Sequence, residues 1–229
     1  LSNHDTVRHA TRFGLTDPTT FPKGIGPGDE QPDAALGLAR ARAATLVALA
    51  LPGSAYLYQG EELGLPEHTT LPAEARQDPT FFRTRGAEIG RDGCRVPLPW
   101  AGEEPGFGFS GGVSPGAPGP WLPQPESFGP LAADQQDGEE GSTLELYRAA
   151  LAFRATQRLG SGTVEWTDEH APESGLLAFR NGETVVLSNM GFASAPVPEG
   201  YAVVLSSGPE PAEEWAGMQE VSVDCTVYL

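Results

Sequence analysis

The hydrophobic and polar positions in the N-terminal part of the chain predict a loop, a helix and a buried strand, in that order. Residues 16–32 are rich in Pro, Gly and Asp, which favour turns, so we expect a surface loop. Residues 34–51 are almost all good helix formers, with Asp33 as N-cap and a Pro-Gly stop behind them. The run 54–59 (SAYLYQ) is short, aromatic and apolar, which is typical of a buried strand. Helix, tight turn and strand together indicate an α/β unit.

The middle of the chain has little periodicity until a second helix begins. Residues 65–141 predict a long loop, and their Gly- and Pro-rich part far exceeds the usual connection of about 4–6 residues. Residues 142–145 (STLE) have the spacing of a capping box. Apolar residues then recur at helical spacing as far as residue 158, namely Leu144, Tyr147, Leu151 and Ala155. We therefore expect an amphipathic helix.

Beyond residue 160 the pattern changes to short β runs, at 163–167, 176–180, 184–189, 201–206 and 221–228. Asn181-Gly182 lies between two of these runs, and both residues tolerate positive φ, which predicts a type I′ hairpin. In the last run Val221, Val223, Cys225 and Val227 alternate with polar residues, which predicts one buried and one exposed face. These runs indicate a separate β domain.

The amino-acid composition excludes several classes of binding partner. The chain has 229 residues, 39% of them hydrophobic, which suits a globular protein of one or two domains. Its formal charge of -17 would repel phosphate backbones and anionic lipid surfaces, so we expect neither a nucleic-acid nor a membrane partner. No run approaches the roughly 18 apolar residues of a membrane span. Cys94 and Cys225 are too few for a disulfide scaffold, so we expect buried thiols.

The beginning of the chain gives little information on targeting. It opens at Leu1 without a charged and apolar leader, and we interpret it as a fragment. A cytoplasmic location is the expectation that remains.

The first residues could carry chemistry. Asn3, His4, Asp5 and Arg8 place an imidazole, a carboxylate and a guanidinium close to a predicted strand end. A cation near Asp5 would keep it ionised, and an ionised carboxylate is useful where positive charge develops, as in glycoside cleavage. Alternatively, Asp5 only caps a helix that starts directly after it. A metal site from His4, Asp5 and His9 is a third interpretation, but no further ligand is suggested, so we expect neither metal nor cofactor.

Three segments in order resemble one enzyme family. Residues 1–8 (LSNHDTVR) resemble the last signature region of α-amylase family barrels, where an Asn-His-Asp trio follows the seventh strand. Residues 56–64 (YLYQGEELG) are similar to the eighth strand and its exit, and residues 91–100 (RDGCRVPLPW) to the following loop of α-glucosidases and isomaltases. The resemblance implies an α/β fold. Residues 1–158 would form the C-terminal part of a TIM-type (β/α) barrel, with a long loop at 65–141, and residues 159–229 a small antiparallel β-sandwich domain.

The resemblance also implies roles for these residues. Asp5 would be the third catalytic carboxylate, which binds hydroxyls of the glucose in the cleavage subsite. His4 would donate to the same hydroxyls, Arg95 would help to close the pocket around the non-reducing end, and Asn3 and Arg8 would support them. Sugar hydroxyls that lose water in a closed pocket need such partners.

Other polar and aromatic residues have weaker claims. Glu61 and Glu62 are adjacent, so they should point in different directions and form ion pairs rather than an acid/base pair. Trp100 and Trp121 could stack on sugar rings, although loop tryptophans more often pack under loops.

The function implied is that of a retaining α-glucosidase, which cleaves terminal α-linked glucose from maltose-like or isomaltose-like oligosaccharides. Such an enzyme needs a nucleophile and a general acid about 5 Å apart. The family places both on earlier strands, so the chain alone should be inactive, with the missing N-terminal half of the barrel as its partner. Alternatives are a non-catalytic amylase-like binding scaffold and a transglycosylase or isomerase of the same family. A carbohydrate-binding β module that uses Trp166 and Trp215 is a weaker alternative.

Overall fold

The computed structural model describes residues 1–110 and 119–229, which form two compact units. The first contains residues 1–38 and 57–139, and the second contains residues 39–56 and 140–229. Contacts within the chain therefore group the second predicted helix with the β strands. The domain division of the whole protein at residue 158 stays a prediction. No helix among the described residues is long and apolar enough to cross a membrane.

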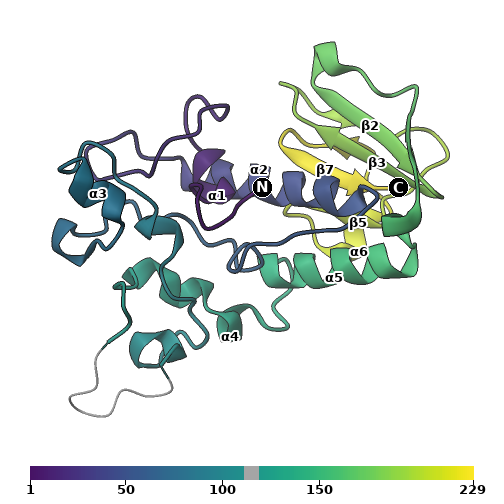
Figure 1. Cartoon of the computed structure of the whole chain (residues 1–229). Helices are drawn as coiled ribbons and strands as arrows, with labels where there is room; N and C mark the ends of the chain where they lie inside the picture. Colours follow the sequence, from purple (N-terminus) through teal and green to yellow (C-terminus); the bar gives the residue numbers. More distant parts are fainter. Residues whose placement is uncertain (111–118) are drawn as a thin grey trace. The chain divides into compact units, whose positions relative to one another are not determined.

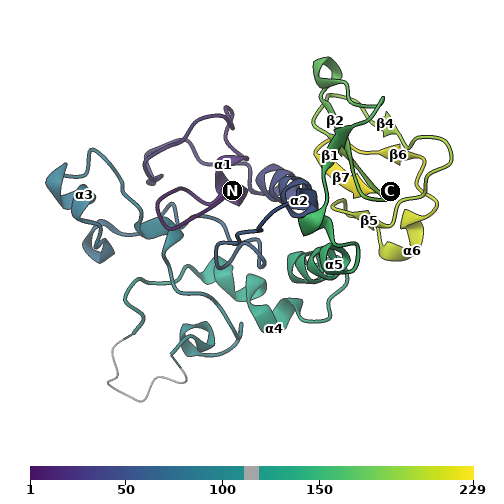
Figure 2. The same cartoon turned by 45° about the vertical axis from the view of Figure 1, so that its right-hand side comes forward.

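The second unit is built on an antiparallel sheet of five strands in the order β1-β2-β3-β7-β5. Figure 1 labels β2, β3, β7 and β5, and Figure 2 labels β1 beside β2. A smaller sheet pairs β4 with β6. The strands are β1 (Val164–Trp166), β2 (Leu176–Asn181), β3 (Thr184–Asn189), β4 (Ala195–Pro196), β5 (Leu205–Ser206), β6 (Glu220–Val221) and β7 (Cys225–Tyr228). A short helix, α6 (Ala212–Trp215), and two 3₁₀ turns, η5 (Leu159–Ser161) and η6 (Pro172–Ser174), complete the unit.

Each face of the larger sheet has its own core. Helices α2 (Ala34–Ala50) and α5 (Thr143–Thr156) cover one face, where Leu46 and Leu146 pack with Phe179 and Tyr228 (Figure 2). The Tyr228 hydroxyl donates to the carbonyl of Leu46. On the other face Ala178, Leu187, Cys225 and Val227 pack with Val203 and Val221. Burial of each Leu, Val or Phe side chain in these cores stabilises the fold by about 1.5–3 kcal/mol.

Both long helices begin as the sequence predicts. The Asp33 carboxylate accepts from the main-chain N–H of Leu36 at 2.9 Å, and the Ser142 hydroxyl accepts from that of Glu145 at 3.2 Å. The buried face of α5 differs from the prediction, because Leu151 is 40% exposed and Ala155 is also exposed. The residues that face the core are Thr143, Leu146, Tyr147 and Ala150, a stripe at the spacing i, i+3, i+4 and i+7.

The hairpin after β2 turns one residue later than predicted. Asn181 pairs with Thr184 as the last residue of its strand, so the loop consists of Gly182 and Glu183. Of these two residues only Gly182 has a positive φ, at 63°, so the predicted type I′ turn is wrong. The cause is the Asn181 amide, which is buried and donates to the carbonyls of Ala50 and Leu159. These bonds hold Asn181 in the strand.

The predicted last strand is divided in two. Val221 is in β6, whereas Val223 is exposed in the turn before β7, and Asp224 has a positive φ of 58°. Strand β7 lies between β3 and β5 and is covered on both faces, so Thr226 is as buried as Val227. The predicted alternation is therefore wrong in this run. Both cysteines are free and buried, as predicted.

The first unit consists mostly of loops with short helical turns. The predicted loop at 16–32 is confirmed, and the long segment 65–141 contains no strand among its described residues. The turns are α1 (His9–Arg12), α3 (Pro79–Arg83) and α4 (Ala133–Gln136), with 3₁₀ turns η1 (Ala73–Ala75), η2 (Asp92–Cys94), η3 (Pro105–Gly108) and η4 (Glu126–Leu131). Part of the Gly- and Pro-rich stretch, 111–118, lies outside the described residues.

The predicted strand at 54–59 does not form. Its residues pair with no strand among those described, and Tyr56 is 88% exposed. A strand is defined by the ladder it makes with a neighbour, and no described segment provides one. Residues 4–6 likewise form a turn rather than the end of a strand.

Candidate active site

A tight turn presents His4 and Asp5 at the surface of the first unit. The side-chain carbonyl of Asn3 accepts from the main-chain N–H of Asp5 at 2.7 Å, an Asx turn that fixes the motif locally. Arg95 donates from Nε to the carbonyl of His4 at 2.7 Å. Helix α1 begins only at His9, with Arg8 as its N-cap residue, so Asp5 is not the cap of that helix.

Asp5 is held by two arginines and a histidine. Its Oδ1 accepts from Nη1 of Arg91 at 2.8 Å and from Nη2 of Arg95 at 3.1 Å, and its Oδ2 lies 3.2 Å from Nε2 of His4. The hydrogen bond from Arg91, helped by the charges of His4, Arg91 and Arg95, lowers the pKa of Asp5. The side chain is 51% exposed, so an ionised carboxylate remains accessible to a ligand.

Arg8 is not the cation beside Asp5. Its side chain is 2% exposed and donates to the carbonyls of Gln59 and Cys94, at 2.9 and 3.0 Å. The guanidinium also lies over the ring of Tyr58, 5.0 Å from its centroid. Arg8 therefore ties together the three segments that carry the motifs, while Arg91 and Arg95 supply the charge that we expected from it.

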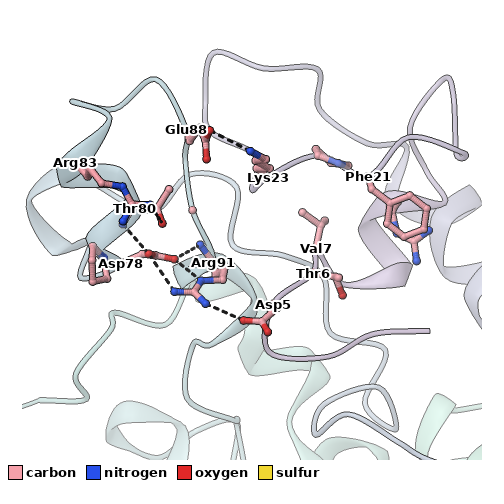
Figure 3. A pocket seen from close by; sticks show the side chains of 14 residues that line it. Asp5, Thr6, Val7, Phe21, Lys23, Asp78, Thr80, Arg83, Glu88 and Arg91 are labelled. Atoms are coloured by element: carbon pink, nitrogen blue, oxygen red, sulfur yellow. Dashed lines mark hydrogen bonds and ion pairs between the residues drawn. The ribbon is translucent and has the colours of Figure 1, made fainter.

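Arg91 is itself anchored by Asp78, and neither residue was predicted from the sequence to have a role in the site. Nε of Arg91 donates to Oδ2 of Asp78 at 2.7 Å, and the main-chain N–H of Arg91 donates to the same oxygen at 2.9 Å (Figure 3). The hydrogen bond from Arg91 lowers the pKa of Asp78, and the bond to Asp78, followed by that to Asp5, raises the pKa of Arg91. A local signal was present, since Asp78 followed by Pro79 has the pattern of an N-cap with Pro at N1.

Asp5 and Arg91 form part of the wall of a pocket of about 550 Å³. Phe21 and Lys23 contribute to another part of the wall (Figure 3). The ring of Phe21 is 68% exposed, with the guanidinium of Arg12 at 4.2 Å from its centroid. A pocket that offers an exposed aromatic side chain and several directed polar groups suits a sugar, which has apolar C–H faces and hydroxyls.

The remaining candidates lie away from this pocket or behind it. Glu62 accepts from the main-chain N–H of Gly60, whereas Glu61 is buried, so the two point in different directions as predicted. Glu61 Oε1 lies 3.7 Å from Nδ1 of His9, but burial lowers the pKa of His9 to about 3. His9 is therefore neutral near pH 7, and the predicted ion pair is not one between full charges.

Trp100 and Trp121 are half exposed and do not line the pocket.

A metal has no evident place at the motif. Nδ1 of His9 lies 2.7 Å from the Ser2 hydroxyl, a side-chain hydrogen bond that occupies this nitrogen. Within residues 1–110 and 119–229, no three His, Cys, Asp or Glu side chains are arranged to hold a metal ion.

A second buried carboxylate, Glu67, was also missed. Its Oε2 accepts from the main-chain N–H of Arg8 at 3.0 Å, and its own N–H donates to the Thr11 hydroxyl at 2.7 Å. Burial raises the pKa of Glu67 to about 7. Gly93 lies against it, and a Cβ at that position would be 2.5 Å from Oε1 of Glu67. Glu67 thus connects the segment around Arg8 and Thr11 to the loop that contains Gly93.

The pocket therefore combines one aromatic ring, that of Phe21, with a carboxylate held by arginines. The model of the α-amylase catalytic domain matches residues 1–162, and the chain belongs to the α-amylase family. It is 35% identical over 188 residues to a probable alpha-glucosidase of Rhizobium meliloti, an alignment that covers 81% of this chain and 29% of the relative. It is 30% identical over 179 residues to the oligo-1,6-glucosidase IMA3 of Saccharomyces cerevisiae, with 69% and 27% covered. The chain therefore spans less than a third of these relatives.

Solved structures agree on the fold. The alpha-glucosyl transfer enzyme XgtA matches with a TM-score of 0.65 and 30% identity, and the match covers 100% of this chain and 37% of that enzyme. The trehalulose synthase MutB of Pseudomonas mesoacidophila matches with a TM-score of 0.68 over 99% of this chain and 41% of its own, and its 21% identity bears on the fold alone. The predicted fold class, part of a TIM-type barrel followed by an antiparallel β domain, is confirmed.

Proposed function

We propose that the whole protein is a retaining α-glucosidase and that Asp5 stabilises the sugar as positive charge develops on its ring. The observation that carries this proposal is the position of Asp5, an ionised and accessible carboxylate on the wall of a pocket. Glycoside cleavage passes through an oxocarbenium-like state, which a fixed anion close to the ring favours. Relatives named alpha-glucosidase and oligo-1,6-glucosidase support the assignment.

Asp5 has no carboxylate partner for double displacement among the described lining residues. Asp78 also belongs to the pocket wall, but its side chain is fully buried and bound to Arg91, so it cannot reach a substrate. Glu88 is paired with Lys23 at 3.1 Å. Barrel enzymes assemble their sites from loops after several strands. We therefore assign the nucleophile and the general acid to the part of the relatives that this chain does not span.

The proposed substrate is a maltose-like or isomaltose-like oligosaccharide with a terminal α-linked glucose. His4, at the surface beside Asp5, would hydrogen-bond a hydroxyl of that glucose. Arg95 contacts both the carbonyl of His4 and the carboxylate of Asp5, so it would close the pocket by keeping the turn in place.

The test is turnover of 4-nitrophenyl α-D-glucoside by the whole protein. We expect glucose to be released with retained α configuration, seen by proton NMR of the first product. Asp5→Asn should lower kcat/KM by roughly 10²-fold or more, in the range measured for single groups that stabilise transition-state charge. Asp17→Asn is the matched control, because the hydrogen bonds that Asp17 forms with described residues lie within its own loop, to Thr19 and Thr20. Wild-type activity of Asp5→Asn would refute the proposed role.

The 229-residue chain alone should not turn over the same glucoside, because it lacks both reacting carboxylates. Appreciable turnover by the chain would contradict the assignment of those groups to the part that the relatives contain in addition.

A transglycosylase or isomerase of the same family is the second candidate, and the name of the structural match XgtA, an alpha-glucosyl transfer enzyme at 30% identity, favours transfer. Analysis of the products distinguishes the hydrolase from the transglycosylase or isomerase. Hydrolysis of maltose or isomaltose gives free glucose, whereas transfer gives longer or rearranged sugars. A non-catalytic scaffold would bind the sugar without either product.

A further inference from the structure

The contact between Arg91 and Asp5 depends on a second carboxylate in the pocket wall, that of Asp78. Asp78 is fully buried, which is costly for an aspartate unless its oxygens are bound. It receives three donors from Arg91: Nε at 2.7 Å and the main-chain N–H at 2.9 Å on Oδ2, and Nη2 at 3.4 Å on Oδ1. Nη1 is the nitrogen that meets Asp5, at 2.8 Å.

Asp78 is itself fixed from several directions. Its Oδ1 accepts from the main-chain N–H of Thr80 as the N-cap of α3, at 2.9 Å. Its own N–H donates to Oδ2 of Asp92 at 2.9 Å. The loop before Arg91 passes directly over it, since a Cβ at Gly90 would lie 3.1 Å from the carboxylate of Asp78. A side chain held so firmly can impose one orientation on a flexible partner.

We propose that Asp78 is a positioning residue, which holds the guanidinium of Arg91 so that one nitrogen meets Asp5 and orients it toward the sugar. Arg91 is partly exposed and would otherwise sample several rotamers. Its planar fork allows it to bind two carboxylates at once, which a lysine cannot do in the same way. The consequence for catalysis rests on the proposed function, whereas the coupling between Asp78 and Asp5 does not.

The simpler interpretation is that Asp78 only caps α3. Asp78→Asn distinguishes a capping role from a positioning role. Asparagine is as good an N-cap as aspartate but presents no negative charge to Arg91. Asp33→Asn is the matched control: Asp33 caps α2 through the N–H of Leu36 and does not line the pocket.

The decisive readout is the titration of Asp5 by carboxyl ¹³C NMR in protein labelled at aspartate, with the signal assigned through Asp5→Asn. Among the described residues, the titratable and charged groups that contact the Asp5 carboxylate are His4, Arg91 and Arg95. In Asp78→Asn, Arg91 is released and the midpoint of Asp5 should move upward, toward the ordinary range. It should not move in Asp33→Asn. An unchanged midpoint in Asp78→Asn would overturn the proposal.

Arg91→Lys serves if Asp78→Asn does not fold, since it keeps the charge at a partly exposed position. It should raise the Asp5 midpoint in the same direction, and an unchanged midpoint would again count against the proposal.

Kinetics of the whole protein give the catalytic consequence. Asp78→Asn should lower kcat roughly tenfold, because small misplacements of a catalytic group cost one to two powers of ten. In an Arg91→Lys background the same change should have no further effect, since Asp78 acts through Arg91. Additive losses would show that Asp78 acts independently. If no variant, wild type included, turns over the glucoside, the proposed function fails, while the titration still decides the coupling.

Discussion

We predict that replacing Arg8 by Met destabilises the folded chain without changing the ionisation of Asp5. The residue next to the motif was expected to keep Asp5 ionised, yet its guanidinium binds the carbonyls of Gln59 and Cys94. Arg8→Met removes these bonds and leaves the apolar stem in place. The perturbation should therefore change the free energy of unfolding and leave the pKa of Asp5 where it is.

The magnitude follows from the contacts. Each hydrogen bond from a charged donor contributes about 1.5–3 kcal/mol, and the contact with Tyr58 about 0.5–1 kcal/mol. One donor of Arg8, Nε, is buried without a hydrogen-bond partner among the described residues, and its removal offsets about 1–3 kcal/mol of this loss. We expect a net loss of about 3 kcal/mol, which lowers the Tm of a chain of this size by roughly 6–12 °C.

The assay is thermal unfolding by calorimetry, combined with the carboxyl titration of Asp5. Arg85→Met is the matched control, because Arg85 is exposed in the same unit, and its Tm should stay within about 1–2 °C of wild type. An unchanged Tm in Arg8→Met would refute the structural role. An upward shift of the Asp5 midpoint would restore the role that the sequence suggested.

Three further predictions follow from the walls of the pocket and the buried groups behind it. Phe21→Ala should raise KM for maltose several-fold, since a stacked ring contributes about 0.5–1.5 kcal/mol, and Phe82→Ala, exposed but outside the pocket, should not. Gly93→Ala should destabilise the protein by about 1–3 kcal/mol in urea unfolding, because its Cβ would meet Glu67, whereas Gly28→Ala has open space and should be neutral. Glu67, with its pKa raised from 4.5 to about 7, binds its proton more tightly in the folded state, so its contribution to stability is lost as pH rises from about 4.5 to 7. Glu67→Gln should flatten the pH dependence of Tm across that window, and an unaltered slope would exclude Glu67 as its source.

The two long helices were predictable because their start signals are local in sequence. The features that were not predicted depend on contacts between residues far apart in the sequence. Asp33 and Ser142 mark helix starts because an N-cap acts within one turn. The strand at 54–59 was not predictable in this way, since a strand also needs a neighbour. The buried side of α5 depended on which stripe meets the sheet, and for this reason Leu151 was wrongly placed.

In the candidate site, too, contacts between residues far apart in the sequence could not be predicted. Asn3, His4 and Asp5 were identified from adjacent residues, and the structure adds that Asp5 lies on a pocket. Arg91 is 86 positions away, and only the fold brings its guanidinium to Asp5. Asp78 could have been recognised as a cap but not as the anchor of Arg91, because no spacing rule connects the two.

The central claim is that the ionised carboxylate of Asp5 stabilises a positively charged sugar ring. Its most direct test is to measure, by calorimetry, how tightly the whole protein binds 1-deoxynojirimycin. This iminosugar carries a positive charge in the ring, and glucose serves as its neutral counterpart. If the account is correct, Asp5→Asn weakens iminosugar binding roughly 10²-fold, the value of about one charge-assisted contact, and glucose binding only a few-fold. Equal losses for both ligands, or none for the iminosugar, would contradict it.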